Sequence, residues 1–252
     1  MDMFSRSTFG VARVFMALAV FFCHVFEQFN QFGFLFVGVF FFLSGFGMER
    51  SQLRMSALRR SVPFVVFLAF FTLVYWVVYR VFPYPSSWFL YVYLVVMAIY
   101  RLLPYRLLPV AFILFALVLY ALDFNFVWYA SFGAFLIGCY VARNERVFTF
   151  SNSIVFLPFF FLVYFGCPIG FWFVLPAFAW LVLRFSSFSL FRSLAWFGQY
   201  TFFFYCVHCF FLGLFSSTWT LGGSPSFYGV LVAFLASCGV SWLLSDFLFK
   251  WR

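Results

Sequence analysis

The sequence predicts an all-α, polytopic integral membrane protein with about ten transmembrane helices and both termini in the cytoplasm. Its composition is 67% hydrophobic and only 8% charged, whereas an average soluble domain is about 45–50% apolar and about 25% charged. A membrane-spanning helix needs roughly 20 apolar residues. The 252 residues therefore predict one transmembrane domain, residues 1–252, that is filled by closely spaced helices.

Helices rather than strands are expected because the apolar runs show no alternation. Residues 64–78 are apolar on every face, whereas a strand of a membrane barrel alternates between apolar and polar positions. A helix also satisfies all of its own backbone hydrogen bonds in lipid. The apolar runs predict helices over 8–28, 32–48, 62–82, 87–103, 107–123, 125–141, 152–167, 169–184, 195–216 and 226–249.

The cations predict the orientation. Lys250 is the only lysine, so fourteen of the fifteen cations are arginine, and most lie between apolar runs. With ten spans nearly all of them fall on one side, which the positive-inside rule assigns to the cytoplasm. The net charge of +9 is therefore interpreted as an insertion signal, and no nucleic-acid partner is expected.

Four ionisable residues stand out in the apolar runs, where a charge costs at least about 2.5–3.5 kcal/mol at mid-depth: Arg13, His24, Glu27 and His208. Arg13 and His24 are eleven residues apart, which places them within about 20° on one helix face and about 16 Å apart along the axis. His24 could act as a base for a hydroxyl, with Glu27 holding the imidazole and Arg13 anchoring an anion. Alternatively, Arg13 reaches the lipid headgroups and His24 bonds a backbone carbonyl.

His208 is the second of the two histidines and is predicted to lie in the outer half of the membrane, as His24 does. Cys206 and Cys209 flank it, but no metal site is expected because a second ligand pair is absent. Earlier in the chain, the run from Gly38 to Gly47 carries three glycines that allow close approach of another backbone or a ligand. Ser44 within this run can bond either a substrate or a helix carbonyl.

Several motifs, in order along nearly the whole chain, resemble the membrane-bound acyltransferase family 3. Gly10 to Arg13, ten further residues, His24 and then the run Gly38 to Phe46 resemble the opening of that family. Later matches are Arg59 to Pro63, Trp88 to Tyr91, Phe132 to Gly138 and Gly198 to His208. The family's core of ten helices agrees with the number expected from composition.

The resemblance implies an O-acyltransferase in the cytoplasmic (inner) membrane of a bacterium. It would move an acyl group, typically acetyl, from cytoplasmic acyl-CoA to a hydroxyl of a surface glycan, lipid or similar acceptor. Acyl-CoA (acetyl-CoA) would be a co-substrate, and no tightly bound cofactor is expected.

The resemblance also assigns roles to individual residues. His24 would be the catalytic general base or an acyl-carrying nucleophile, with Glu27 beside it. Arg13, Arg59 and Arg60 would bind the donor. Acceptor-binding or cavity-lining positions would be Ser44, Tyr205 and His208.

Two other interpretations remain open. A polar stripe through a helical bundle is also what a non-enzymatic exporter of glycans or lipids needs. A degenerate or truncated enzyme would also fit the short connecting loops. The sequence leaves open the acceptor, the acyl chain length and the oligomeric state.

Overall fold

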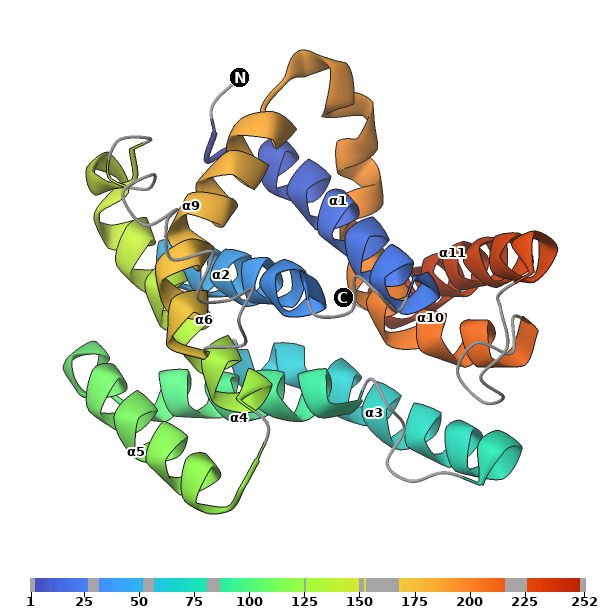
Figure 1. Ribbon diagram of the computed structural model, residues 1–252, viewed down its shortest axis with the longest axis horizontal. Helices are drawn as coiled ribbons and strands as arrows, with labels where there is room; N and C mark the ends of the chain where they lie inside the picture. Colours follow the sequence, from blue (N-terminus) through green and yellow to red (C-terminus); the bar gives the residue numbers. More distant parts are fainter. Residues whose placement is uncertain are drawn as a thin grey trace. The chain divides into compact units, whose positions relative to one another are not determined.

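The computed structural model describes residues 3–26, 32–51, 57–80, 87–124, 126–149, 152, 168–215 and 226–249. Every regular element within these ranges is a helix (Figure 1). The chain forms two compact units. Unit 1 comprises Met1–Phe36, Val66–Ser87 and Ser186–Arg252, and unit 2 comprises Val37–Val65 and Trp88–Phe185.

Unit 1 is organised around the first helix, α1 (Arg6–Val25). Ser5 caps α1 by accepting a hydrogen bond from the Thr8 amide at 3.2 Å. Its principal neighbours are the 3₁₀ helix η6 (Ser189–Gln199) and α10 (Thr201–Phe215), and α10 in turn packs on α11 (Phe227–Phe249). A Cβ added to Gly198 would collide with the Gly10 backbone, so α1 and η6 cross with their main chains in contact.

Unit 2 contains most of α2 (Gly33–Ser51) together with the helices in the middle of the chain. In order, these are α4 (Ser87–Leu102), η3 (Tyr105–Leu107), α5 (Leu108–Ala121), α6 (Val127–Arg143), η4 (Glu145–Val147) and α9 (Pro168–Ser186). Helix α3 (Ala57–Tyr79) begins in unit 2 and continues into unit 1. A Cβ on Gly45 would collide with the Phe135 carbonyl oxygen, and one on Gly138 with that of Phe42, so α2 and α6 also cross backbone to backbone.

The predicted helices agree closely with the observed ones where both can be compared. The predicted helix 152–167 falls outside the described residues, apart from residue 152. One predicted helix, 195–216, is in fact two elements, because η6 ends at Gln199 and α10 begins at Thr201. The Thr201 hydroxyl donates to the Gly198 carbonyl at 2.9 Å, which satisfies a backbone acceptor at the break.

The all-helical class is confirmed, but the described helices do not reach about ten membrane spans. Three are long and apolar enough to cross a bilayer: Arg6–Val25, Gly33–Ser51 and Phe227–Phe247. A fourth arises if Val174–Ser186 and Ser189–Gln199, which are bent by 109°, count as one span. Helices α4, α5 and α10 have 16, 14 and 15 residues, below the minimum of about 17.

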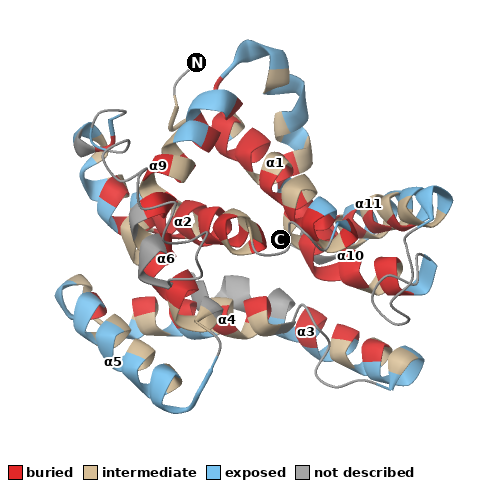
Figure 2. Cartoon of the chain, viewed as in Figure 1, coloured by how far each residue is buried: buried red, intermediate tan, exposed pale blue. Residues whose placement is uncertain are grey.

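The outer surfaces of several helices are apolar. Leu108 is the one buried residue of α5, and most of α11 is exposed or partly exposed (Figure 2). Side chains such as Leu114, Leu117 and Leu235 are more than half exposed. Soluble monomers rarely expose contiguous apolar patches larger than a few hundred Å², whereas α5 is exposed or partly exposed along nearly its whole length. These surfaces are those of a membrane protein.

Candidate functional site

Helices α1 and α10 bring the two histidines of the chain together in unit 1. The ring centroids of His24 and His208 are 5.2 Å apart, and the rings are stacked with an angle of 30° between their planes. His208 is buried and His24 is half-buried. Aromatic side chains surround His208: the Phe204 ring is nearly parallel to it at 5.9 Å, and the Phe21 ring lies at 6.1 Å. The pair therefore lies in an apolar environment.

The orientation of His208 is fixed by its own helix. Its Nδ1 lies 3.2 Å from the Phe204 carbonyl oxygen. Because a carbonyl can only accept, the hydrogen of the neutral ring belongs on Nδ1, which donates to Phe204 and leaves a lone pair on Nε2. That Nε2 lies 3.4 Å from the Sγ of Cys209.

Cys209 makes the histidine pair a cluster of three. One ligand-type atom each from His24, His208 and Cys209 lies within 4.8 Å of the other two. We call these residues the His–Cys cluster. Cys206 is also buried in α10 but is not part of this group. The sequence named Cys209 beside His208, but no metal site was expected there because no further ligand was apparent. The residue that completes the cluster, His24, comes from a distant segment.

The structure describes only some of the other predicted site residues. Arg13 is half-buried in α1, and Tyr205 is buried with its ring 5.6 Å from that of His208. Arg59 and Arg60 lie in the first turn of α3, and their side chains are outside the described residues. Glu27 is outside them altogether, so its role beside His24 stays a prediction.

Ser44 serves its own helix in unit 2. Its hydroxyl donates to the Phe40 carbonyl at 2.8 Å, which is the hydrogen bond to a helix carbonyl that the sequence offered as one alternative. Contact of Ser44 with an acceptor remains a prediction.

The glycines near Ser44 differ in the space that surrounds them. A Cβ on Gly38 would meet the Phe171 and Leu175 side chains, one on Gly45 would meet backbone, and one on Gly47 would meet nothing within 4 Å.

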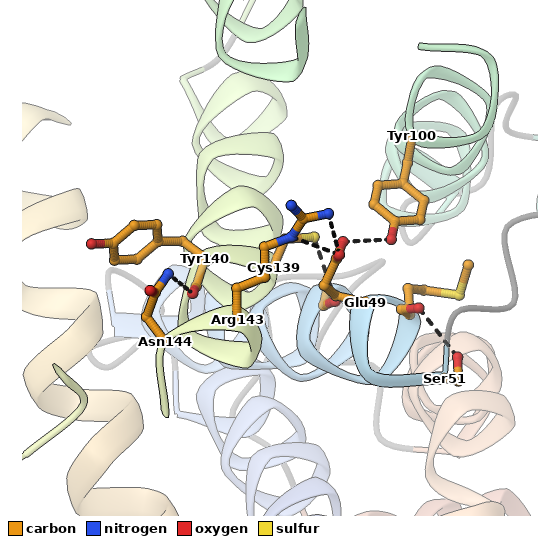
Figure 3. Close-up of polar contacts among 9 residues, drawn as sticks. Glu49, Ser51, Tyr100, Cys139, Tyr140, Arg143 and Asn144 are labelled. Atoms are coloured by element: carbon orange, nitrogen blue, oxygen red, sulfur yellow. Dashed lines mark hydrogen bonds and ion pairs between the residues drawn. The ribbon is translucent and has the colours of Figure 1, made fainter. Parts of the chain in front are cut away.

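Unit 2 also contains a polar group that sequence reasoning missed, the Glu49 cluster of Glu49, Tyr100 and Arg143 (Figure 3). The Tyr100 hydroxyl donates to Glu49 Oε2 at 2.7 Å, and Arg143 Nε donates to Oε1 at 2.7 Å. The Arg143 guanidinium also lies 3.5 Å from the centroid of the Tyr105 ring. The Glu49 side chain is only 12% exposed. Glu49 could have been found from the sequence because it is an acidic residue at the end of an apolar run, in a chain with only six acidic residues.

A small apolar hollow adjoins α1 near His24. It has a volume of about 240 Å³ and is lined by Ala19, Phe22, Cys23, Phe32 and Phe36. These residues all belong to unit 1. The hollow offers almost no polar group to a ligand, so its chemistry suits a short hydrocarbon portion.

Comparison with known proteins adds no assignment. No family model matches the chain, and neither a curated protein nor a solved structure matches it. The resemblance to acyltransferase family 3 therefore rests on the sequence motifs.

Proposed function

We propose that this protein is a membrane-bound O-acyltransferase of the kind that its sequence motifs resemble. In this proposal it spans the cytoplasmic membrane of a bacterium about ten times with both termini in the cytoplasm. The observation that carries the proposal is the meeting of the two histidines, from α1 and α10, in apolar surroundings. Imidazole is the side chain best suited to carry a proton near neutral pH.

His24 would be the base and His208 its positioning partner. His208 is buried, its Nδ1 is bound to Phe204 and its Nε2 faces Cys209, whereas His24 is half-buried and more accessible to a substrate. His24 would take the proton of the acceptor hydroxyl as that oxygen attacks the carbonyl carbon of the acyl thioester. The carbon–sulfur bond then breaks, and the CoA thiolate leaves with the proton from His24.

The donor would approach from the cytoplasmic end. Arg13 lies about 16 Å from His24 along the axis of α1, a separation that the extended pantetheine arm of CoA can bridge. Arg13 would then pair with a phosphate of the donor. The hollow of about 240 Å³ beside Cys23 could receive a short acyl chain.

The test is transfer from labelled acetyl-CoA to acceptor in membranes that carry the wild type or His24→Ala. We expect His24→Ala to lower the rate by about 10²- to 10⁴-fold, which is the usual contribution of a general base. Phe26→Ala is the control, because this exposed side chain lies just beyond α1 and its loss should leave the rate unchanged. Equal labelling by wild type and His24→Ala would remove the role assigned to His24.

A second pair of variants tests the donor site. Arg13→Gln should raise KM for acetyl-CoA by about 10- to 150-fold, because one charge-assisted contact to phosphate is worth about 1.5–3 kcal/mol. Arg192→Gln removes an exposed arginine of η6 and should leave KM unchanged. A different pair of results would indicate an exporter instead. Neither the wild type nor the variants would transfer acyl groups, and deletion of the gene would make the unmodified glycan or lipid accumulate inside the cell.

A further inference from the structure

We propose that the His–Cys cluster binds a soft d¹⁰ metal ion, Cu⁺ or Zn²⁺, with His24, His208 and Cys209 as its ligands. Thiolate and imidazole are the side chains that such ions prefer. One ligand-type atom from each of the three residues lies within 4.8 Å of the other two, and the residues come from two packed helices, α1 and α10. This inference concerns binding, and its test does not depend on the proposed acyltransferase activity. Because a metal-bound imidazole has no free lone pair, His24 would act as a base only in the metal-free protein.

The geometry of His208 and Cys209 is already close to that of a metal site. A metal-binding histidine usually donates its second ring N–H to a carbonyl or carboxylate, which fixes the tautomer. His208 does this through Nδ1 and the Phe204 carbonyl. Zinc bond lengths of about 2.0 Å to nitrogen and about 2.3 Å to sulfur place two tetrahedral ligands about 3.5 Å apart, and Nε2 of His208 lies 3.4 Å from Sγ of Cys209.

His24 must turn to complete the site. A metal binds in the plane of an imidazole, so two stacked rings cannot both ligate the same ion without rotation of one ring. His24 is suited to rotate because it is half-buried, whereas His208 is buried. It also lies in the last turn of α1, which ends at Val25 and is followed by an extended residue, Phe26. A change of side-chain rotamer would bring the third ligand into place.

The charge of the site favours Cu⁺. Metal binding displaces the thiol proton of Cys209, which is released to solvent. Cu⁺ and one thiolate are together neutral, whereas Zn²⁺ and one thiolate leave a positive charge among apolar groups, where an uncompensated charge is costly. A trigonal set of two imidazoles and one thiolate also needs no fourth ligand on Cu⁺, whereas Zn²⁺ takes a fourth ligand to complete its tetrahedron.

The test uses the full-length protein, purified in detergent and stripped of metal with a chelator. Cu⁺ kept reduced by ascorbate, or Zn²⁺, is added, and its affinity is measured by competition with a chromogenic chelator. We expect one ion per chain and a loss of affinity of about 100-fold or more in Cys209→Ser. The matched control is Cys206→Ser, which alters a second buried cysteine three residues earlier in α10 and should leave affinity unchanged.

A second variant protects the test against misfolding. His24→Ala removes a half-buried ligand and should weaken binding while the metal-free protein keeps its wild-type elution volume and unfolding temperature. Tighter binding of Cu⁺ than of Zn²⁺ would support the charge argument, and the reverse order would overturn that argument. Equal binding by wild type, Cys209→Ser and His24→Ala, or no binding of either ion by the wild type, would overturn the site. Acyl transfer is not measured, so failure of the proposed function cannot produce these outcomes.

Discussion

At the level of single residues, Glu49 is expected to make a measurable contribution to stability. Its carboxylate accepts from Tyr100 and Arg143 and is 12% exposed. Glu49→Ala would leave both donors without this acceptor, so we expect a loss of about 1–3 kcal/mol in the free energy of unfolding. Unfolding in a graded mixture of denaturing and mild detergents, followed by tryptophan fluorescence, measures this loss.

Glu145 provides the matched control for that prediction. It pairs with Arg50 at 3.6 Å, and the two side chains are 37% and 50% exposed. Exposed ion pairs contribute about 0–1 kcal/mol, so Glu145→Ala should change stability by less than about 1 kcal/mol. Equal losses in both variants would mean that the Glu49 hydrogen bonds add nothing beyond a surface ion pair.

At this scale, sequence reasoning found residues that conflict with a lipid environment and missed those that matter through their partners. His24 and His208 stand out because imidazoles are rare in apolar runs, and the structure places their rings 5.2 Å apart. Cys209 was named beside His208 but given no role, because a buried cysteine looks like a small apolar residue until its neighbours are known. Glu49 was missed because an acid beside Arg50 at a helix end resembles an ordinary solvated terminus.

Between elements, the crossing of α2 and α6 depends on the absence of side chains at Gly45 and Gly138. A Cβ on Gly45 would collide with the Phe135 carbonyl, whereas a Cβ on Gly47, in the same helix, would meet nothing within 4 Å. Gly45→Ala must push the helices apart, which typically costs about 1–3 kcal/mol. Gly47→Ala should be neutral or stabilising by up to about 1 kcal/mol through helix propensity.

The same detergent unfolding experiment compares the two glycine variants. A lower unfolding midpoint for Gly45→Ala with an unchanged or higher midpoint for Gly47→Ala is the expected pattern. Similar midpoints for both would show that α2 and α6 can separate at no cost.

Helix positions were predictable because long apolar runs leave the backbone no alternative in lipid. The observed α2, Gly33–Ser51, for example, differs by only a few residues from the predicted 32–48. The break between η6 and α10 was not predictable in this way. It depends on a hydroxyl of Thr201 that satisfies the Gly198 carbonyl, and on a close backbone contact between Gly198 and Gly10. Neither the hydrogen bond nor the backbone contact changes the hydrophobicity pattern of the sequence.

For the whole molecule, the question is how a chain with so many short helices relates to the bilayer. Composition and the regular placement of arginines indicated about ten spans, whereas three described helices, or four with the bent pair, are both long and apolar enough to cross a bilayer. Hydrophobicity reports that a segment avoids water, but it does not report whether the segment crosses, tilts or turns back. That choice depends on packing and local bilayer thickness.

Helix α5 gives the sharpest test of the number of spans. Together with η3 it forms an apolar stretch, Tyr105–Ala121, that at 1.5 Å per residue is about 25 Å long, somewhat less than a hydrocarbon core of about 30 Å. Modest thinning of the bilayer covers this mismatch, and the exposed apolar surface of α5 suits lipid. We therefore expect α5 to cross, with Arg106 on the cytoplasmic side.

Compartment-specific reporters joined after Pro104 and after Asp123 measure this crossing directly. The ten-span topology predicts a cytoplasmic signal from the first and an external signal from the second. Reporters after Asn30 and after Ser56, which flank the well-formed span of α2, serve as the positive control and should also report opposite sides. If the control pair differs while the pair around α5 reports one compartment, α5 lies along the membrane surface or turns back. The orientation of every helix after it would then have to be reassigned.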